Sequence, residues 1–181
     1  ETAKIALQAA LTGHLVLTTL HTNDATGTVV RLQALGEKPV NIAPAINLAI
    51  GQRLVRKVCK KCQKLEKVTD KELSKIKKAL GSLPKKAKEK IKLPPLNKNL
   101  KIPKAKGCAQ CNFTGYRGRI GIFEFFLVDD EMESFILKSP SISELRKKAK
   151  EKGMVTMKED GLIKVITGIT TLEEIERVTG E

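Results

Sequence analysis

All four cysteines of the chain fall in two Cys-x-x-Cys pairs, Cys59/Cys62 and Cys108/Cys111. Each pair can form a tight turn that brings two thiolates together, and two such turns supply the four sulfur ligands of a tetrahedral zinc site. No His or carboxylate belongs to the set, and no coordination position is left open. The spacing therefore predicts one zinc ion with a structural role.

Disulfides and dithiol redox sites are the alternatives for paired cysteines. Disulfides belong to oxidising compartments, and the chain shows no secretory signal. Gln63 and Asn112 follow the two pairs, whereas c-type haem attachment needs a histidine there. We therefore favour zinc.

The two histidines, His14 and His21, flank a run of β-forming residues that we expect to form a buried strand, 14–20. A straight strand would separate the histidines by about 23 Å, too far to share a metal. Ligands of parallel α/β sheets bind beyond the carboxyl ends of the strands, which is where His21 lies. The sequence thus favours His21 over His14 at a ligand site.

Three hydroxyl residues, Thr18, Thr19 and Thr22, surround His21 in the sequence. Hydroxyls and imidazole can both donate hydrogen bonds to a phosphate, so the cluster suits a phosphate sensor. The alternative, a histidine that only ends a strand in a turn, stays open on the pattern alone.

The elements that position these residues read as helix, buried strand and helix, typical of part of an α/β layered sheet. Apolar spacing predicts helices over 2–11, 25–35 and 41–58. One strand is too few for a sheet, so we expect further strands upstream in a longer protein. Without an initiator Met, and with apolar runs shorter than the about 20 residues that span a bilayer, the chain reads as a soluble fragment.

The rest of the chain reads as an insert followed by a helical region. In the lysine-rich stretch between the Cys pairs we expect one helix, 71–80, and otherwise irregular chain. Residues 119–128 are β-rich and should return to the main body as a strand. Ser141/Glu144 and Thr171/Glu174 match the capping box of a helix start. Short helices are expected over 130–138, 142–152, 157–167 and 171–179.

Most of the net charge of +14 lies in the insert, because residues 64–106 contain 15 lysines and 4 acidic residues. Lysines without neighbouring arginines or aromatics are typical of a solvated surface. A patch for a partner or an anionic membrane is the alternative.

Several motifs in a fixed order give the chain a specific resemblance. They are Glu1-Thr-Ala, Thr12-Gly-His-Leu-Val-Leu-Thr-Thr-Leu-His-Thr-Asn-Asp-Ala25, Gln52-Arg-Leu-Val-Arg56, the two Cys pairs, Gly115-Tyr-Arg-Gly-Arg-Ile-Gly-Ile-Phe-Glu124, Gly153-Met-Val-Thr-Met-Lys-Glu-Asp-Gly161 and Gly168-Ile-Thr-Thr-Leu-Glu-Glu174. In these motifs the chain resembles the hexameric ATPases of type II secretion and type IV pilus assembly. The resemblance covers nearly the whole chain except the basic insert.

The resemblance implies an α/β fold: a partial RecA-like P-loop NTPase domain with an inserted tetracysteine zinc module and a C-terminal helical region. The expected parts are the C-terminal part of the ATPase domain, the zinc module with its Lys-rich insert, the return strand and the helical region. They span 1–58, 59–111, 112–128 and 129–181.

The resemblance also implies a function in the full-length protein. The family's motors work in the cytoplasm, peripheral at the inner membrane, as homo-hexamers that use ATP and Mg²⁺. They drive pilin-like subunits out of the inner membrane, and an inner-membrane platform protein is the expected partner. His14 and His21 match the two histidines of the family's His box, implicated near the γ-phosphate; we call residues 12–25 the His-box segment. Retraction motors generally lack the tetracysteine motif, which disfavours retraction.

One departure from the family matters. The chain contains no G-x-x-x-x-G-K-[ST], so the backbone nest and the lysine that hold phosphates are missing. We expect the chain alone neither to bind nor to hydrolyse ATP. Arg53 and Arg56 could reach the phosphates of a neighbouring subunit; surface arginines on a helix are the alternative reading.

A stand-alone zinc-dependent nucleic-acid-binding module is the alternative from another class. It would use the lysine insert with Phe113, Tyr116, Arg117 and Arg119. Base stacking needs exposed aromatics, and the chain has only five Phe and one Tyr. We therefore do not expect nucleic acid as a partner.

Overall fold

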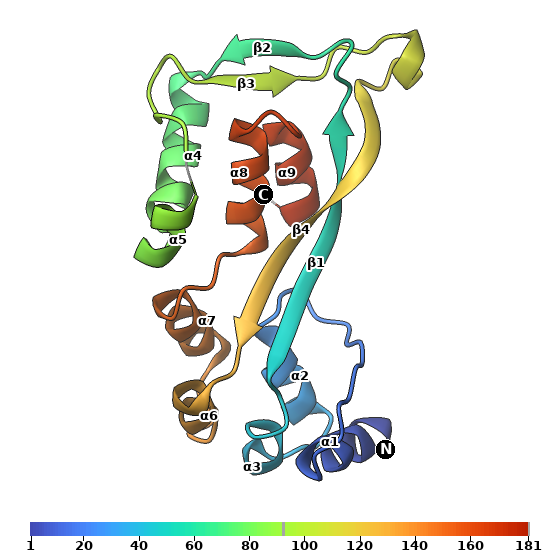
Figure 1. Ribbon diagram of the computed structural model, residues 1–181, viewed down its shortest axis with the longest axis vertical. Coiled ribbons are helices and arrows are strands. Elements are labelled where there is room, and N and C mark those ends of the chain that lie inside the picture. Colours follow the sequence, from blue (N-terminus) through green and yellow to red (C-terminus); the bar gives the residue numbers. More distant parts are fainter. Residues whose placement is uncertain (92, 181) are drawn as a thin grey trace. The chain divides into compact units, whose positions relative to one another are not determined.

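The computed structural model describes residues 1–91 and 93–180 and combines helices with strands (Figure 1). Contacts divide the chain into two compact units. Unit 1 comprises Glu1–Gly51 and Glu124–Met154, and unit 2 comprises Gln52–Phe123 and Val155–Glu181. The division of the chain into four functional parts stays a prediction.

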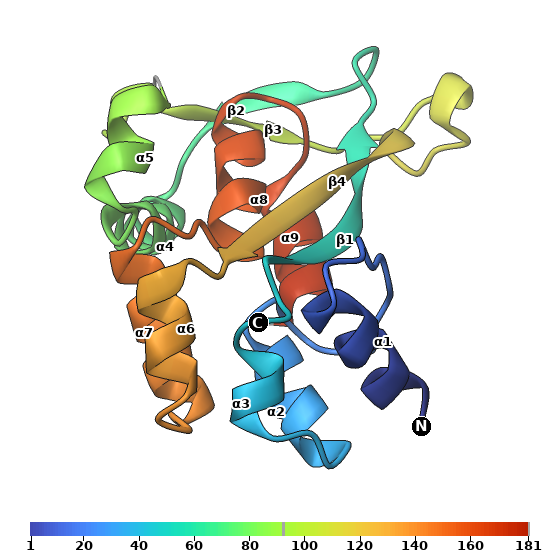
Figure 2. The same ribbon diagram turned by 60° about the horizontal axis from the view of Figure 1, so that its bottom comes forward.

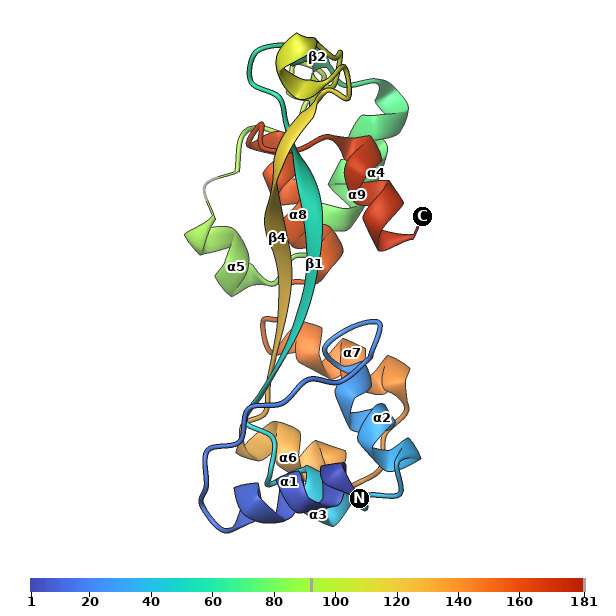
Figure 3. The same cartoon turned by 90° about the vertical axis from the view of Figure 1, so that its right-hand side faces the viewer.

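Two long strands each have residues in both units. They are β1 (Leu48–Val58) and β4 (Tyr116–Leu127), and they pair with each other (Figure 3). The strand expected over 119–128 is thereby confirmed as the larger part of β4.

Unit 1 consists mainly of short helices around an aliphatic core (Figure 2). The helices are α1 (Thr2–Leu11), α2 (Gly27–Ala34), α3 (Pro39–Ile42), α6 (Asp130–Ile136) and α7 (Ile142–Glu151). Their buried side chains pack with Phe126 of β4; the largest are Leu7, Leu32, Ile42, Met132, Ile136 and Leu145. The predicted helices over 2–11, 25–35, 130–138 and 142–152 are confirmed. Within the described residues, no helix has the length and apolar character needed to span a bilayer.

The strand expected over 14–20 does not form. The described chain has no regular secondary structure there, and Leu15 and Leu17 are each 87 % exposed. A strand needs a neighbour for its backbone donors and acceptors, and both sheets of the described residues are made of other segments. A composition of β-forming residues was therefore not sufficient to form a strand, because the segment has no strand to pair with.

The helix expected over 41–58 is also wrong. α3 ends at Ile42, and β1 occupies Leu48–Val58. Pro44 lacks the N–H that a continuing helix needs, and the residues beyond it pair with β4. Residues 48–58 form a strand because they pair with β4, and local periodicity does not reveal such pairing.

Unit 2 packs helices and a small sheet around a second core. The sheet pairs β2 (Lys64–Lys67) with β3 (Lys101–Lys104) in an antiparallel register that sets Lys64 opposite Lys104. The helices are α4 (Asp70–Gly81), α5 (Lys85–Lys90), the 3-10 turn η1 (Ala109–Cys111), α8 (Met157–Ile166) and α9 (Leu172–Thr179). The predicted helices over 71–80, 157–167 and 171–179 are confirmed.

The lysine-rich insert is more ordered than the sequence suggested. We expected irregular chain beyond one helix, yet the insert also forms β2, β3 and α5. Leu73, Ile76 and Leu80 from α4, together with Ile102 from β3, are buried in the core of unit 2. These apolar residues alternate with lysines, so the charge of the insert masked its amphipathic pattern.

The two predicted capping boxes behave differently. Ser141 and Glu144 form a complete box at the start of α7. At α9, the Thr171 hydroxyl accepts from the backbone N–H of Glu174 at 3.3 Å. The Glu174 carboxylate, however, binds Arg56 and Arg177.

The Glu174 carboxylate binds two arginines inside unit 2, and its side chain is fully buried. It accepts from the backbone N–H of Arg56 at 2.9 Å and from the Arg56 guanidinium at 3.0 and 2.6 Å. Arg177 donates two further bonds, at 2.8 and 2.7 Å. Arg56 also lies over the ring of Tyr116, 4.1 Å from its centroid, and the Tyr116 hydroxyl is 2.8 Å from that of Thr171. The cluster ties α9 to β1 and β4.

Burial alone would raise the pKa of Glu174, but the hydrogen bonds from Arg177 and Arg56 outweigh burial and lower this pKa to about 2. A carboxyl with a lowered pKa stabilises the fold above its unfolded-state pKa, and this contribution is lost as the pH falls through its folded-state value.

We predict that Glu174→Gln lowers the free energy of unfolding by about 2 kcal/mol at pH 7, because charge-assisted hydrogen bonds are lost in a buried site. Urea unfolding between pH 7 and pH 2 measures the change. The difference from the parent chain should shrink as the pH falls from 4.5, the ordinary value for Glu, towards 2. Glu176→Gln is the control, since Glu176 pairs with the exposed Lys75 and should cost less than about 1 kcal/mol. Equal stability of the Glu174 variant and its parent would contradict the role of the cluster.

Candidate metal centre and His-box segment

The four cysteine sulfurs converge at one end of unit 2, all within 4.8 Å of one another. The Sγ–Sγ distances are 4.0 Å for Cys59–Cys108, 3.8 Å for Cys62–Cys111 and 3.7 Å for Cys108–Cys111. The sulfurs are therefore too far apart for disulfides, which need about 2.05 Å, and all four thiols are free. A zinc ion with Zn–S bonds of about 2.3 Å sets its tetrahedral ligands about 3.8 Å apart. The sulfur positions fit such an ion.

Backbone hydrogen bonds shape the two cysteine turns. The amide of Gln63 donates to the carbonyl of Cys59, and that of Phe113 donates to the carbonyl of Cys108, each at 2.9 Å. A bond of 2.9 Å from the Cys59 amide to the Gly115 carbonyl joins the first turn to the second. Gly115 has a φ of +78°, and a Cβ there would lie 2.6 Å from that of Ala105. Glycine is therefore required where the second turn leads into β4.

The electrostatics of the cluster also favour a cation. Burial raises the pKa of the Cys111 thiol, but donation from the backbone amides of Cys108 and Gly115 outweighs it and lowers this pKa to about 6. Burial and the neighbouring thiols raise the pKa of Cys62 to about 11. Four thiolates at this spacing repel one another unless a positive ion lies between them. The residues present thus fit a structural metal, which would supply no reactive position here.

The His-box segment belongs to unit 1. His14, Thr18, Thr19 and His21 are exposed, and Thr22 is partly buried. The Nδ1 atom of His14 is 3.1 Å from the hydroxyl of Thr12, and the Thr22 hydroxyl donates to the carbonyl of Asp24 at 3.0 Å. Among the described residues, no hydrogen bond joins either histidine to Thr18, Thr19 or Thr22. Their roles at a nucleotide stay a prediction.

The segment is fixed at the end that contains His21. One oxygen of Asp24 accepts from the Thr26 hydroxyl at 2.8 Å and from the Gly27 amide at 2.7 Å, which satisfies donors at the start of α2. The other oxygen accepts from Arg146 of α7. The amide of Ala25 donates to the buried Glu124 of β4 at 2.9 Å. Three separate elements thus hold the turn beside His21.

The pKa of Asp24 reflects this environment. Burial raises it, but the bonds from Thr26, Arg146 and Gly27 together outweigh burial, so the pKa of Asp24 lies below its usual value. The sequence analysis did not predict the contacts of Glu124 and Arg146 with this turn. Both residues lie about a hundred residues further along the chain, and no local pattern predicts contacts over that separation.

Arg53 and Arg56 lie in unit 2, on β1 and not on the helix that we expected. Arg56 is bound to Glu174, and the guanidinium of Arg53 contacts the carbonyl of Val178. Contact with a neighbouring subunit's phosphates stays a prediction for both.

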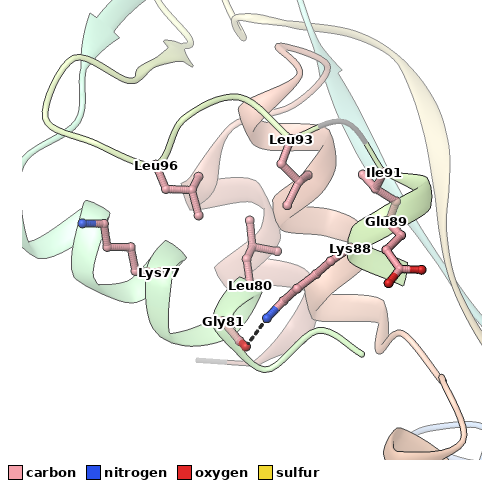
Figure 4. A pocket seen from close by; sticks show the side chains of 8 residues that line it. All are labelled: Lys77, Leu80, Gly81, Lys88, Glu89, Ile91, Leu93 and Leu96. Carbon is pink, nitrogen blue, oxygen red and sulfur yellow. Dashed lines mark hydrogen bonds between the residues drawn. The ribbon is translucent and has the colours of Figure 1, made fainter. Parts of the chain in front are cut away.

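A separate open pocket of about 610 Å³ lies between α4, α5 and the segment after α5 (Figure 4). Its walls are mainly the aliphatic side chains of Leu80, Ile91, Leu93 and Leu96. The ammonium group of Lys88 donates to the carbonyl of Gly81 at 2.7 Å, so it already has a hydrogen-bond partner within the protein. Among the described residues that line it, the pocket has no convergent set of polar groups for a nucleotide.

We predict one zinc ion per purified chain, measured by elemental analysis, and a loss of that zinc in Cys108→Ser. Replacing a thiolate weakens a closed four-sulfur site because no other ligand is available. The control is Gln110→Ser, which changes an exposed residue of the same turn. Full metal content in the Cys108 variant would contradict the assignment.

Comparison with known proteins agrees with the sequence resemblance. A family model described as "Type II/IV secretion system protein" matches residues 1–177. The type IV pilus assembly ATPase PilB of Thermus thermophilus is 45 % identical over 97 % of this chain and 18 % of its own length. The type II secretion system ATPase E of Vibrio cholerae is 43 % identical over the whole chain and 33 % of its own length.

One solved structure has a similar fold. The ATPase DotB of Legionella pneumophila aligns with a TM-score of 0.54 at 24 % identity, over 97 % of this chain and 34 % of DotB. The chain thus has a mixed α/β fold like a segment of that ATPase, and it spans between 18 % and 33 % of the curated relatives named above. On the match over residues 1–177, the chain belongs to the type II/IV secretion system protein family.

Proposed function

We propose that the chain is the C-terminal portion of a hexameric motor ATPase that powers pilus assembly or type II protein secretion. The observation that carries this proposal is the family match over residues 1–177, with relatives named as pilus assembly and type II secretion ATPases. The chain spans at most about a third of those relatives, so ATP hydrolysis is proposed for the longer protein. We also propose that the chain includes part of a RecA-like domain.

Exposed apolar residues of unit 1 support the idea that further protein covers it. Leu48 and Ile50 are exposed at alternate positions of β1, and Phe125 and Leu127 at alternate positions of β4. Residues two apart in a strand share a face, so each strand presents an apolar face to solvent. Leu15 and Leu17 repeat this spacing in the His-box segment. Such faces are typical of surfaces that another protein segment buries.

In the proposed motor, this chain provides one wall of the nucleotide site. Phosphoryl transfer depends mainly on positioning and on stabilising the charge of the phosphates. Residues outside the chain would bind ATP and Mg²⁺, and His21 would sense the terminal phosphate from a turn held by Asp24, Glu124 and Arg146. His14 and the three threonines are the further candidates.

The proposal extends to assembly and location. Family resemblance leads us to propose a homo-hexamer in the cytoplasm, peripheral at the inner membrane, with a platform protein of the pilus or secretion machinery as partner. The bond from Arg56 to the buried Glu174 supports a stabilising role for this arginine within its own subunit, and Arg53 remains the better candidate to reach a neighbour.

A stand-alone nucleic-acid module is less well supported. The ring of Tyr116 lies against Arg56, and its hydroxyl is bonded to Thr171, so this aromatic is not available to stack on a base. Phe126 is buried. Of the aromatic residues proposed for this reading, Phe113 alone remains exposed among the described residues, whereas strands of bases are bound by several aromatic platforms.

We predict that the 181-residue chain has no ATPase activity above background and no measurable ATP binding, whereas the full-length protein hydrolyses ATP. The phosphate-binding loop is outside the chain, and positioning of phosphates is the main source of catalysis. Release of inorganic phosphate measures turnover, and calorimetry measures binding. Turnover by the 181-residue chain at the rate of the full-length protein would contradict the proposal.

We further predict that His21→Ala lowers kcat of the full-length protein by about 100-fold and leaves KM nearly unchanged, as expected for a group that acts on charge in the transition state. His14→Ala is the matched control, and its effect should be smaller because His14 lies outside the anchored turn. A larger loss of kcat in the His14 variant would assign the role at the terminal phosphate to His14 and not to His21.

A further inference from the structure

The open pocket of unit 2 between α4, α5 and the segment after α5 exposes apolar side chains to solvent. Leu80 of α4 belongs to the buried core of unit 2, and Leu93 and Leu96 pack against that core. Figure 4 shows these side chains converging from α4 and from the segment after α5. The volume of about 610 Å³ is typical of binding pockets. The apolar wall of the pocket is therefore an extension of the core that remains open on one side.

The walls of the pocket are restrained within the protein itself. Lys88 of α5 donates to the carbonyl of Gly81 at 2.7 Å, and this bond ties α5 to the end of α4. Another wall is the segment Leu93-Pro94-Pro95-Leu96, in which each proline ring fixes its own φ. A restrained surface loses little conformational freedom on binding, so more of the interaction free energy becomes affinity.

The surroundings of the pocket are basic. Residues 77–98 contain eight lysines and one acidic residue, Glu89. Four exposed lysines of this range have no ion pair within the described part of the chain. They are Lys77, Lys78, Lys88 and Lys90. Like charges on one surface repel one another, and an acidic partner relieves this repulsion. We call these four the rim lysines.

The walls lack the groups that several classes of partner need. Addition of a strand requires a free strand edge, and none of the described residues that line the pocket belongs to a strand. Proline-rich peptides and nucleic-acid bases are bound by aromatic side chains, and phosphopeptides by clusters of arginine. Residues 77–98 contain neither an aromatic residue nor an arginine.

A bilayer is also a poor match for this pocket. Apolar side chains that enter a membrane interface project from the surface of a protein. Leu80, Leu93 and Leu96, by contrast, line a hollow, and each is buried or only partly exposed. Such a hollow fits side chains that project from a partner.

An amphipathic helix supplies side chains of this kind. In helix-in-groove binding, apolar residues at spacings of three and four enter an aliphatic groove. Acidic residues beside these apolar anchors would lie next to the rim lysines. Charge complementarity of this kind speeds association and selects against basic partners.

We propose that the pocket between α4 and α5 binds an acidic amphipathic helix of a partner protein. Aliphatic side chains of the helix contact Leu80, Leu93 and Leu96, and its carboxylates lie beside the rim lysines. The lysine-rich insert is thereby a recognition element of unit 2. The proposal does not depend on the motor assignment, since it concerns a contact between proteins and not ATP hydrolysis.

Selection from a displayed library of random peptides tests the chemistry of the partner. The peptides are about 16 residues long, which is enough for a helical segment, and they are selected on the zinc-loaded chain. We expect enrichment of peptides with aliphatic residues at helical spacing and with Asp or Glu on their other faces. Enrichment of basic or proline-rich peptides, or of none, would contradict the proposal.

Variants of Gly81 test whether an enriched peptide binds in the pocket. Gly81 lines the pocket at the end of α4, and a Cβ on it would meet nothing within 4 Å. A larger side chain is therefore accommodated without a clash and narrows the pocket. Fluorescence anisotropy of the labelled peptide should show at least about 10-fold weaker binding to Gly81→Leu, because the apolar anchors lose their place. Gly81→Ala is the matched control and should bind like the parent chain.

Urea unfolding verifies that both Gly81 variants are folded. Equal affinity of Gly81→Leu and the parent chain for the peptide would overturn the proposal. Binding of phosphatidylglycerol vesicles that is lost in Gly81→Leu would also overturn it, because the pocket would then take up acyl chains.

A charge variant tests the rim lysines separately. Lys77→Glu should weaken binding of the peptide about 5-fold, because it places a carboxylate beside the acidic residues of the peptide. The difference should shrink at high salt, which screens exposed charges. Lys138→Glu makes the same change in net charge at an exposed position of unit 1 and should have little effect. Equal losses in the two variants would mean a response to net charge alone and would contradict the proposal.

Discussion

The close approach of four cysteine thiols is the constraint on which unit 2 depends. Sulfur atoms within 4.8 Å of one another cannot all ionise without a cation, and a metal ion bound among them would relieve that repulsion and close the long loop between the two Cys pairs. With its two ends close together, the loop forms β2, β3 and α4, and it buries its own aliphatic residues against α8 and α9. The backbone amides of Cys108 and Gly115 donate to the sulfur of Cys111 at 3.2 and 3.3 Å, so this sulfur also orders the second cysteine turn.

How far the sequence predicted the structure depended on the range of the interactions involved. The cysteine cluster was predicted correctly because two short spacings define it. Most helices were predicted as well, since apolar periodicity and caps such as Ser141 with Glu144 act within one or two turns. The segment 14–20 and the residues after Pro44 were assigned incorrectly because a strand is decided by its partner. The contacts by which Glu124 and Arg146 fix the His-box turn join residues about a hundred positions apart, and no local pattern predicts them.

The residues singled out for chemistry are distributed over both units. The His-box segment and its anchors Asp24, Glu124 and Arg146 belong to unit 1, whereas the cysteines and Arg56 belong to unit 2. β4 begins directly after the second cysteine turn and ends in unit 1, where it contributes Glu124 to the His-box turn. β4 therefore contributes residues to both units.

The Glu174 cluster limits how this part of the sequence can change over evolutionary time. One buried carboxylate accepts from two guanidinium groups, so the loss of either arginine removes part of what compensates its charge. Arg56, Glu174 and Arg177 should therefore be inherited as a group. A lineage can abandon them only through an apolar replacement of comparable volume, which preserves packing without the charges. Drift at these three positions is thus expected to be concerted, while the exposed lysines of α4 can vary one at a time.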